Sequence, residues 1–142
     1  MIENRSVPTD TMLSHVVYKD VDAAIQWLSS VFGFVEHYRY GESSGAQMHL
    51  GDAWIMVRKA RPGELTPAQL GCWTQSLTVF VEDVEAHYKK AKAVGAKIVE
   101  ELNETAYGEF QYGVEDLDGH HWLFARHARD VSPEDWGAKL AD

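Results

Sequence analysis

Cysteine is almost absent from this sequence. The one cysteine among its 142 residues, Cys72, cannot form an internal disulfide and cannot supply a zinc site with several thiolates. This usage is typical of a reducing compartment, so we expect a cytoplasmic protein. Long apolar runs are absent as well: no segment approaches the roughly eighteen apolar residues that span a bilayer, and the polar start at residues 1–6 has no apolar signal core.

Positive charge is scarce. Lys and Arg number 13 against 22 Asp and Glu, which gives a formal net charge of −9. A field of this sign repels phosphate backbones and anionic lipid headgroups, so we expect neither a nucleic-acid partner nor a membrane partner. Hydrophobic residues at 45% with charged residues at 25% predict one packed domain rather than a disordered chain or a coiled coil.

The chain contains an internal repeat. Asp20-Val21-Asp22-Ala23 returns sixty-three residues later as Asp83-Val84-Glu85-Ala86. Each run predicts a helix start, because Asp is a good N-cap and acids in the first turn suit the helix dipole. Apolar residues then recur at helical spacing, and Gly33 and Gly95 are expected to end the two helices.

Strand-like segments surround both predicted helices. The pattern predicts strands at about 13–18, 34–41 and 45–50 in the first half and at about 76–81, 96–101 and 109–116 in the second. A last strand in each half follows a hairpin glycine, because Gly51 to Arg58 matches Gly119 to Arg126 with Gly, Trp, an aliphatic residue and Arg at the same places. Each half therefore reads strand, helix, strand, strand, strand.

This order predicts an α+β fold of two βαβββ modules within a single domain, residues 1–142. We expect the first module at about 12–59, a turn-rich linker at about 60–73, the second module at about 75–128 and a C-terminal tail at 129–142. Within the tail, Ser132-Pro133-Glu134-Asp135 predicts a short helix running to about Leu140.

These signatures resemble the vicinal oxygen chelate superfamily, which includes glyoxalase I, fosfomycin-resistance and bleomycin-resistance proteins and extradiol dioxygenases. The resemblance covers residues 12–128 and is carried by the two acidic helix starts, by Phe32-Gly33-Phe34, by Val94-Gly95-Ala96 and by Asp118-Gly119-His120, with Leu117 where the family usually has proline. Within this superfamily, the sequence is similar above all to uncharacterised glyoxalase-like members related to the PhnB-like branch. The resemblance implies a cupped eight-stranded mixed sheet with its helices on the outer face and a ligand cavity inside.

The family's divalent metal is expected to be missing. Alignment to the family's ligand positions by counting from the helix-capping aspartates and the hairpin glycines gives Leu13, Ile55, Ser76 and Leu123. Three aliphatic side chains cannot coordinate a metal, and one hydroxyl replaces an imidazole or a carboxylate poorly. We therefore expect no metal and no other cofactor. A displaced metal site stays open as an alternative, and it would use inward histidines and a carboxylate: His15, His49, Glu115 and His121.

Strand alternation predicts which side chains point into the cup. Val17, Ala53, Ile55 and Leu123 would form an apolar floor, whereas Trp54 and Trp122 would point to the helices. Polar groups buried on one face cost free energy unless they are used, so this mixture is typical of a small-ligand site. The expected ligand-binding residues are His15, Gln47, His49, Ser76, Thr78, Gln111, Glu115 and His121. Alternatively, these groups satisfy one another in an unoccupied barrel.

The expected function is sequestration of a small organic molecule by a metal-free, bleomycin-resistance-like binding protein. The alternative is a glyoxalase-like lyase or another enzyme of the superfamily, metal-assisted or metal-free, for which Glu115 or His15 would be the general base. A third reading is a structural module that only dimerises. The resemblance also implies a homodimer.

Overall fold

The computed structural model describes residues 12–142 and divides them into two compact units. The first unit holds the described residues up to Thr74 together with Leu117–His120, and the second holds Gln75–Asp116 with His121–Asp142. Each unit contains one copy of the sequence repeat. The loop Leu117–His120 is exchanged, because it follows a strand of the second unit in sequence but packs with the first.

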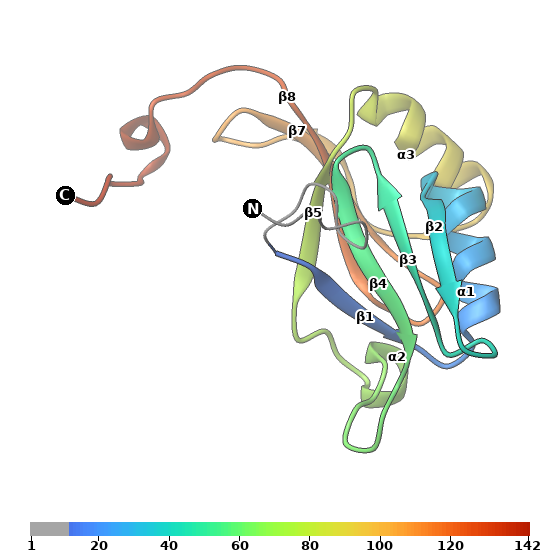
Figure 1. The fold of residues 1–142 in the computed structure, drawn as a ribbon. Helices are drawn as coiled ribbons and strands as arrows, with labels where there is room; N and C mark the ends of the chain where they lie inside the picture. The colour runs from blue at the N-terminus through green and yellow to red at the C-terminus, as the bar shows by residue number, and fades with distance from the viewer. Residues whose placement is uncertain (1–11) are drawn as a thin grey trace, which may run out of the picture. The chain divides into compact units, whose positions relative to one another are not determined.

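The first unit is a four-stranded mixed sheet with one main helix (Figure 1). Strand β1 pairs in parallel with β4, and β4, β3 and β2 follow as antiparallel neighbours. Asp20 caps α1 by accepting the Ala23 N–H, and Gly33 ends the helical segment at φ 88°, a conformation that favours glycine. Its elements are β1 (Ser14–Tyr18), α1 (Val21–Trp27) with a π-helical continuation (Leu28–Phe32), β2 (Val35–Tyr40), β3 (Gly45–Leu50), β4 (Ala53–Lys59) and α2 (Pro67–Leu70).

The second unit repeats this plan in the strand order β5-β8-β7-β6, again with one parallel pair, β5 and β8. The α+β fold of two βαβββ modules is thus confirmed, and its eight strands form two hydrogen-bonded sheets of four. The C-terminal helix is shorter than predicted, because Gly137 ends it at φ 94°. The elements are β5 (Ser76–Phe80), α3 (Val84–Ala93), β6 (Lys97–Glu104), β7 (Glu109–Glu115), β8 (His121–His127) and a 3-10 helix (Pro133–Trp136).

In each unit the helix covers one face of its sheet, and that face holds the apolar core. In the first unit α1 packs on β3 and β4, over fully or almost fully buried side chains. In the second unit α3 packs on β6, β7 and β8, where Trp122 and Phe124 are completely buried. His87 of α3 joins this core, with its ring centroid 4.1 Å from that of Phe124 and its Nδ1 2.5 Å from the Tyr112 hydroxyl.

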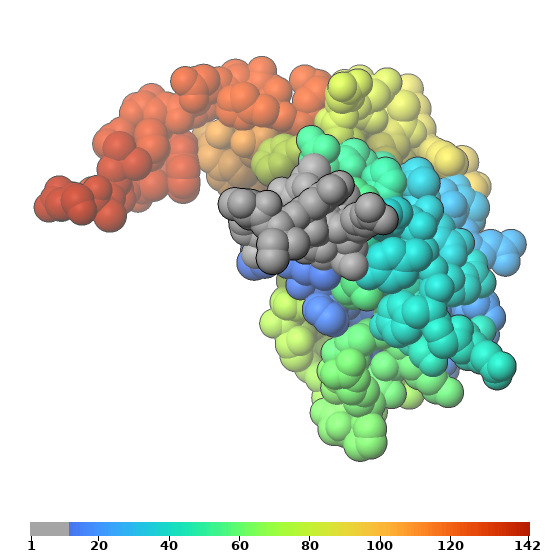
Figure 2. Space-filling view, viewed as in Figure 1, coloured from blue at the N-terminus to red at the C-terminus, as the bar shows by residue number. Residues whose placement is uncertain are grey.

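The segment after β4 is more ordered than the linker predicted for 60–73. Thr66 and Gln69 form a reciprocal capping box around α2, with Pro67 at the first helical position. Asp118 fixes the exchanged loop to this unit, since its carbonyl accepts the Ala68 N–H and its carboxylate accepts the Lys19 N–H at 2.8 Å. The loop between β4 and α2, around residues 60–65, projects from the first unit and is green in Figure 2.

The C-terminal segment extends away from the sheet of its own unit (Figures 1 and 2). It is held near the turn before β7, where the Gly108 carbonyl accepts the N–H groups of Ala128 and Arg129. Tyr107 contacts Trp136 at 5.5 Å between ring centroids. Among the described residues, no helix is long and apolar enough to cross a membrane.

Candidate binding face of each sheet

The predicted ligand residues of the first module share the face of the sheet that α1 leaves uncovered, which we call the helix-free face. The register pairs both His15 and Gln47 with Met56, and it pairs His49 with Trp54. Since pairing partners project to the same side of a sheet, these five side chains lie on one face. The register places on this face His15, Val17, Val35, Tyr38, Tyr40, Gly45, Gln47, His49, Trp54, Met56 and Arg58.

Gln47 is the most enclosed polar residue of this face, with no exposed surface. Its side-chain oxygen lies 2.6 Å from His37 Nδ1, so that nitrogen carries the proton and donates it. Its amide nitrogen lies 3.8 Å from the sulfur of Met56, a weak acceptor. His37 reaches this face because a bulge in β2 shifts the register between Glu36 and Tyr38.

Arg58 connects His15 to the loop after β4. Its Nε donates to His15 Nδ1 at 3.2 Å, and both terminal nitrogens bind the two carboxylate oxygens of Glu64 at 2.7 Å. This fork-to-fork pair is the strongest geometry available to a guanidinium. Hydrogen bonds from the Arg58 side chain and from the Arg61 N–H lower the pKa of Glu64 to about 2. The imidazole is thereby oriented with Nδ1 as an acceptor.

The orientation predicted for β4 is wrong. Trp54 stacks on His49 at 4.5 Å and lies on the helix-free face, whereas Ile55 is buried on the α1 face, together with Ala53. The cause is the length of the two hairpins. The first hairpin closes with the two-residue turn Gly51-Asp52, but the second needs the five residues 116–120. The residue four places after the hairpin glycine therefore lies on the α1 face in the first unit and on the helix-free face in the second.

The second sheet has a helix-free face of its own, and here the predicted alternation agrees with the register. Glu115 pairs with His121, which in turn pairs with Ser76, and Thr78 pairs with Leu123. Trp122 points to α3, as predicted. The hydroxyl-bearing side chains on β5 are exposed. The register places on this face Ser76, Thr78, Phe80, Lys97, Glu100, Asn103, Glu109, Gln111, Gly113, Glu115, His121, Leu123, Ala125 and His127.

Gly113 makes room for the close packing of this second set. A Cβ at this position would lie 3.1 Å from Glu100 Cβ and 3.3 Å from both His121 Nε2 and Leu123 Cδ2. The glycine therefore lets an imidazole, a carboxylate-bearing side chain and an aliphatic side chain converge over the backbone. Glu100 is oriented by Gln111, whose amide nitrogen donates to it at 2.9 Å, and Gln111 accepts from the Tyr107 hydroxyl at 3.3 Å.

Electrostatics set the charge state of His121. Burial lowers the pKa of the imidazole, while the carboxylates of Glu100 and Glu115 act in the opposite direction with smaller effect. The net lowering favours a neutral ring at neutral pH, with one nitrogen able to accept a proton. Lys97 lies 3.3 Å from Glu115 and partly balances its charge.

The donor set does not fit the divalent metal that the family resemblance implies. Of the four aligned positions, Leu13, Ser76 and Leu123 carry no strong metal ligand. Ile55 is turned to the α1 face, and β4 instead offers Trp54 and Met56 on the helix-free face. Of the carboxylates near His121, Glu100 is already bonded to Gln111 and Glu115 is paired with Lys97. Within residues 12–142, no group of three or more His, Cys, Asp or Glu side chains is arranged to hold a metal ion.

Sequence reasoning missed several residues of the two faces. The count from the hairpin glycine puts Trp54 on the wrong side, and Met56 and Arg58 are not among the predicted site residues. Alternation within β4 puts these three residues on one face, but the pairing of β4 with its neighbours decides which face that is. Glu100 lay beyond any signal of this kind, because bulges shift the register of β6 on both sides of it.

The chain belongs to the Glyoxalase/Bleomycin resistance protein/Dioxygenase superfamily, whose sequence profile it matches over residues 11–124. That match spans both repeats and agrees with the two βαβββ units.

Among solved structures, the chain is similar to TioX from Micromonospora sp. ML1, with a TM-score of 0.69 and 33% identity over 87% of this chain and 100% of that one. A glyoxalase/bleomycin resistance protein/dioxygenase family enzyme from Burkholderia phytofirmans PsJN shares the fold at a TM-score of 0.67 and 20% identity, covering 84% and 99% of the two chains. An uncharacterised protein of Mycobacterium tuberculosis strain H37Rv, Rv0887c, is 28% identical over 137 residues, covering 89% of this chain and 80% of the relative.

Proposed function

We propose that this protein binds a small organic molecule on the helix-free faces of its sheets through its own side chains, without a metal or another cofactor. One observation carries the proposal. The helix-free faces contain polar side chains that are buried and oriented by hydrogen bonds, among them Gln47, Arg58 and Gln111. Burying such groups costs free energy that an apolar core avoids, which favours a recognition role over a purely structural one.

The two faces offer different chemistry. On the first sheet, the stacked rings of His49 and Trp54, with His37 edge-on at 5.2 Å to Trp54, form an aromatic surface beside a fixed amide and imidazole. Such a surface suits a planar or aromatic group. On the second sheet, Glu100, Glu115 and His121 present acceptors that suit a hydrogen-bond donor or an organic cation. The ligand we favour for the first face therefore carries an aromatic group, and the ligand we favour for the second face carries a basic group.

The test is a thermal-shift screen across aromatic amines, polyamines, aromatic acids and antibiotics, followed by calorimetry on each hit. A ligand at one hundred times its dissociation constant adds about 2.7 kcal/mol to the stability and raises the melting temperature by several degrees. We expect His15→Ala to weaken a hit that binds the first face and Glu115→Gln to weaken a hit that binds the second. The matched control for the change of charge is Glu82→Gln, since that glutamate is exposed in the turn before α3 and lies on neither sheet. Failure of every ligand class would refute the proposal.

A second candidate, an enzyme that uses a general base, is favoured by one specific observation. The lowered pKa of His121 supplies a neutral imidazole next to two carboxylates. Turnover of a bound ligand that is abolished by His121→Gln, with the dissociation constant little changed, would establish this candidate. Binding without turnover would establish sequestration.

We also propose that the protein is a homodimer, because each sheet has edge strands and isologous pairing is the common way to protect them. Light scattering at a mass of about twice 16.0 kDa would support the dimer, and a 16.0 kDa particle at every concentration would refute it.

A further inference from the structure

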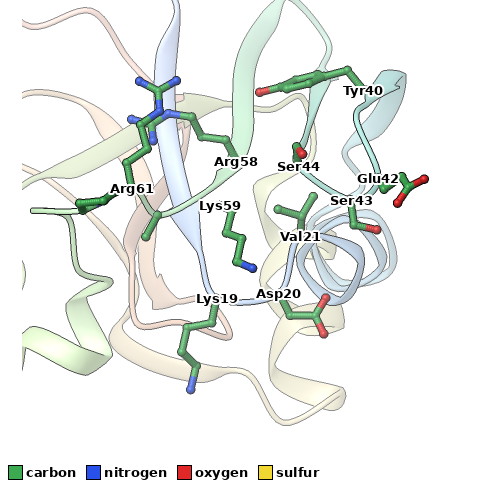
Figure 3. Close-up of a pocket in the computed structure, with 12 residues that line it drawn as sticks. Lys19, Asp20, Val21, Tyr40, Glu42, Ser43, Ser44, Arg58, Lys59 and Arg61 are labelled. Carbon is green, nitrogen blue, oxygen red and sulfur yellow. The ribbon is translucent and has the colours of Figure 1, made fainter.

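We propose that a hollow at one end of the first unit is a binding site for the phosphoryl group of a small organic phosphate. The hollow has a volume of about 630 Å³, within the range of small-ligand sites. It lies where β1 and β4 end and where the turn between β2 and β3 passes, and Figure 3 shows these three segments around it. This proposal does not rest on the proposed function.

Charge is the first argument. The lining includes Lys19, Arg58, Lys59 and Arg61 but only two acidic residues, in a chain whose net charge is −9. Cations concentrated in one concave place of an acidic protein focus the local field on an anion. The same overall charge repels an extended polyanion, so the site favours a small anion over a nucleic acid.

Most of these cations are uncommitted. Arg58 is held by Glu64, but the side chains of Lys19, Lys59 and Arg61 form no hydrogen bond or ion pair with any part of the chain that the structure describes. Lys and Arg form strong charge-assisted hydrogen bonds to phosphate oxygens, and several together suit a doubly charged group.

The acidic residues of the lining do not cancel this charge inside the hollow. Asp20 is occupied as the cap of α1, where its carboxylate accepts the Ala23 N–H at 3.1 Å. Glu42 is exposed, and in Figure 3 its carboxylate points away from Lys59.

The walls are fixed in place before any ligand arrives. The turn between β2 and β3 is tied to α1 by Ser43, whose hydroxyl donates to Asp22 at 2.7 Å while its backbone holds φ 63°. The opposite wall is tied to the same turn, since the Lys59 N–H donates to the Ser44 carbonyl at 3.1 Å. Such preorganisation reduces the entropy lost on binding. The hydroxyls of Ser44 and Tyr40 add uncharged donors to the lining.

An adjoining hollow provides space for the organic part of the ligand. It has a volume of about 440 Å³ and shares Lys19, Lys59 and Arg61 with the first. Its lining adds Tyr18, the exposed side chain of Leu65 and Glu64, whose carboxylate is paired with Arg58. A phosphate monoester with a small apolar group therefore fits the pair of hollows better than inorganic phosphate does.

The test is an NMR titration of the full chain with phenyl phosphate, inorganic phosphate and benzoate at constant ionic strength. We expect saturable shifts of the amides of Ser44 and residues 59–61, with phenyl phosphate binding more tightly than the other two. Lys59→Gln and Arg61→Gln should each weaken phenyl phosphate binding about twofold to fivefold. The control is Lys90→Gln, which removes the same charge from an exposed side chain of α3 and should leave binding unchanged.

Three results would overturn the proposal: no saturable shift at these amides, equal weakening by Lys90→Gln, or benzoate binding as tightly as phenyl phosphate. The variants avoid every residue predicted to bind the ligand of the helix-free faces. A failure here therefore leaves the proposed function untouched, and a failure of the thermal-shift screen against non-phosphate ligands leaves this site untouched.

Discussion

Trp122 and Trp54 hold matching places in the sequence repeat but opposite faces in the structure, which makes them a matched pair for mutation. Trp122→Ala removes a completely buried indole that stacks over Phe124 and donates to Asp116 at 3.0 Å. Truncation of such a residue costs about 3 to 5 kcal/mol, and the lost hydrogen bond adds about 1 kcal/mol. Trp54→Ala removes a half-buried indole that stacks on the His49 ring, at a cost of about 1 to 2 kcal/mol.

Urea denaturation followed by circular dichroism measures both costs without relying on tryptophan fluorescence. We expect the Trp122 variant to lose at least twice the free energy of unfolding that the Trp54 variant loses. If Trp122→Ala does not fold, Trp122→Phe and Trp54→Phe give the same comparison with smaller losses. Equal losses, or a larger loss at Trp54, would refute the assignment of the two faces.

Three further outcomes follow from particular contacts. Because Arg58 holds the pKa of Glu64 at about 2, below its ordinary 4.5, the stabilisation from this ion pair is present above pH 4.5 and is lost as the pH falls toward 2. The urea midpoint of Glu64→Gln should therefore change less with pH between 4.5 and 2 than the midpoint of the unmodified protein does. The lowered pKa of His121 means that stability falls as the pH drops below 6.5, and His121→Gln should remove that slope, whereas an unchanged slope would contradict the burial argument. Gly108→Ala should destabilise the protein, as a melting curve would show, because φ is 92° and a Cβ would lie 2.1 Å from a backbone oxygen; Gly63→Ala, at φ 89° in open space, is the control and should cost less.

The fold could be predicted from local patterns because each pattern reports a local physical requirement. The two acidic runs at Asp20 and Asp83 begin helices because orphan amide groups need acceptors there, and Gly33 and Gly95 end the helical segments at positive φ. The strands start and end within a few residues of their predicted bounds, because turn residues separate the β-branched and aromatic segments that form them.

The candidate site was less predictable because it depends on register. A shift of one residue moves a side chain to the opposite face, and hairpin length decides that shift, as Trp54 and Ile55 show. The bulges in β2 and β6 bring His37 and Glu100 onto the helix-free faces, and no periodicity in the sequence marks them.

The sequence by itself determined the duplicated α+β plan and the family, since these depend on residue type and on spacing within a few turns of chain. Only the tertiary structure decided which side chains of β4 share a face with His15, that Arg58 joins that histidine to Glu64, and that Lys19, Lys59 and Arg61 surround one hollow. These relations join residues far apart in the chain, and backbone hydrogen bonding between strands, rather than local preference, sets which of them meet.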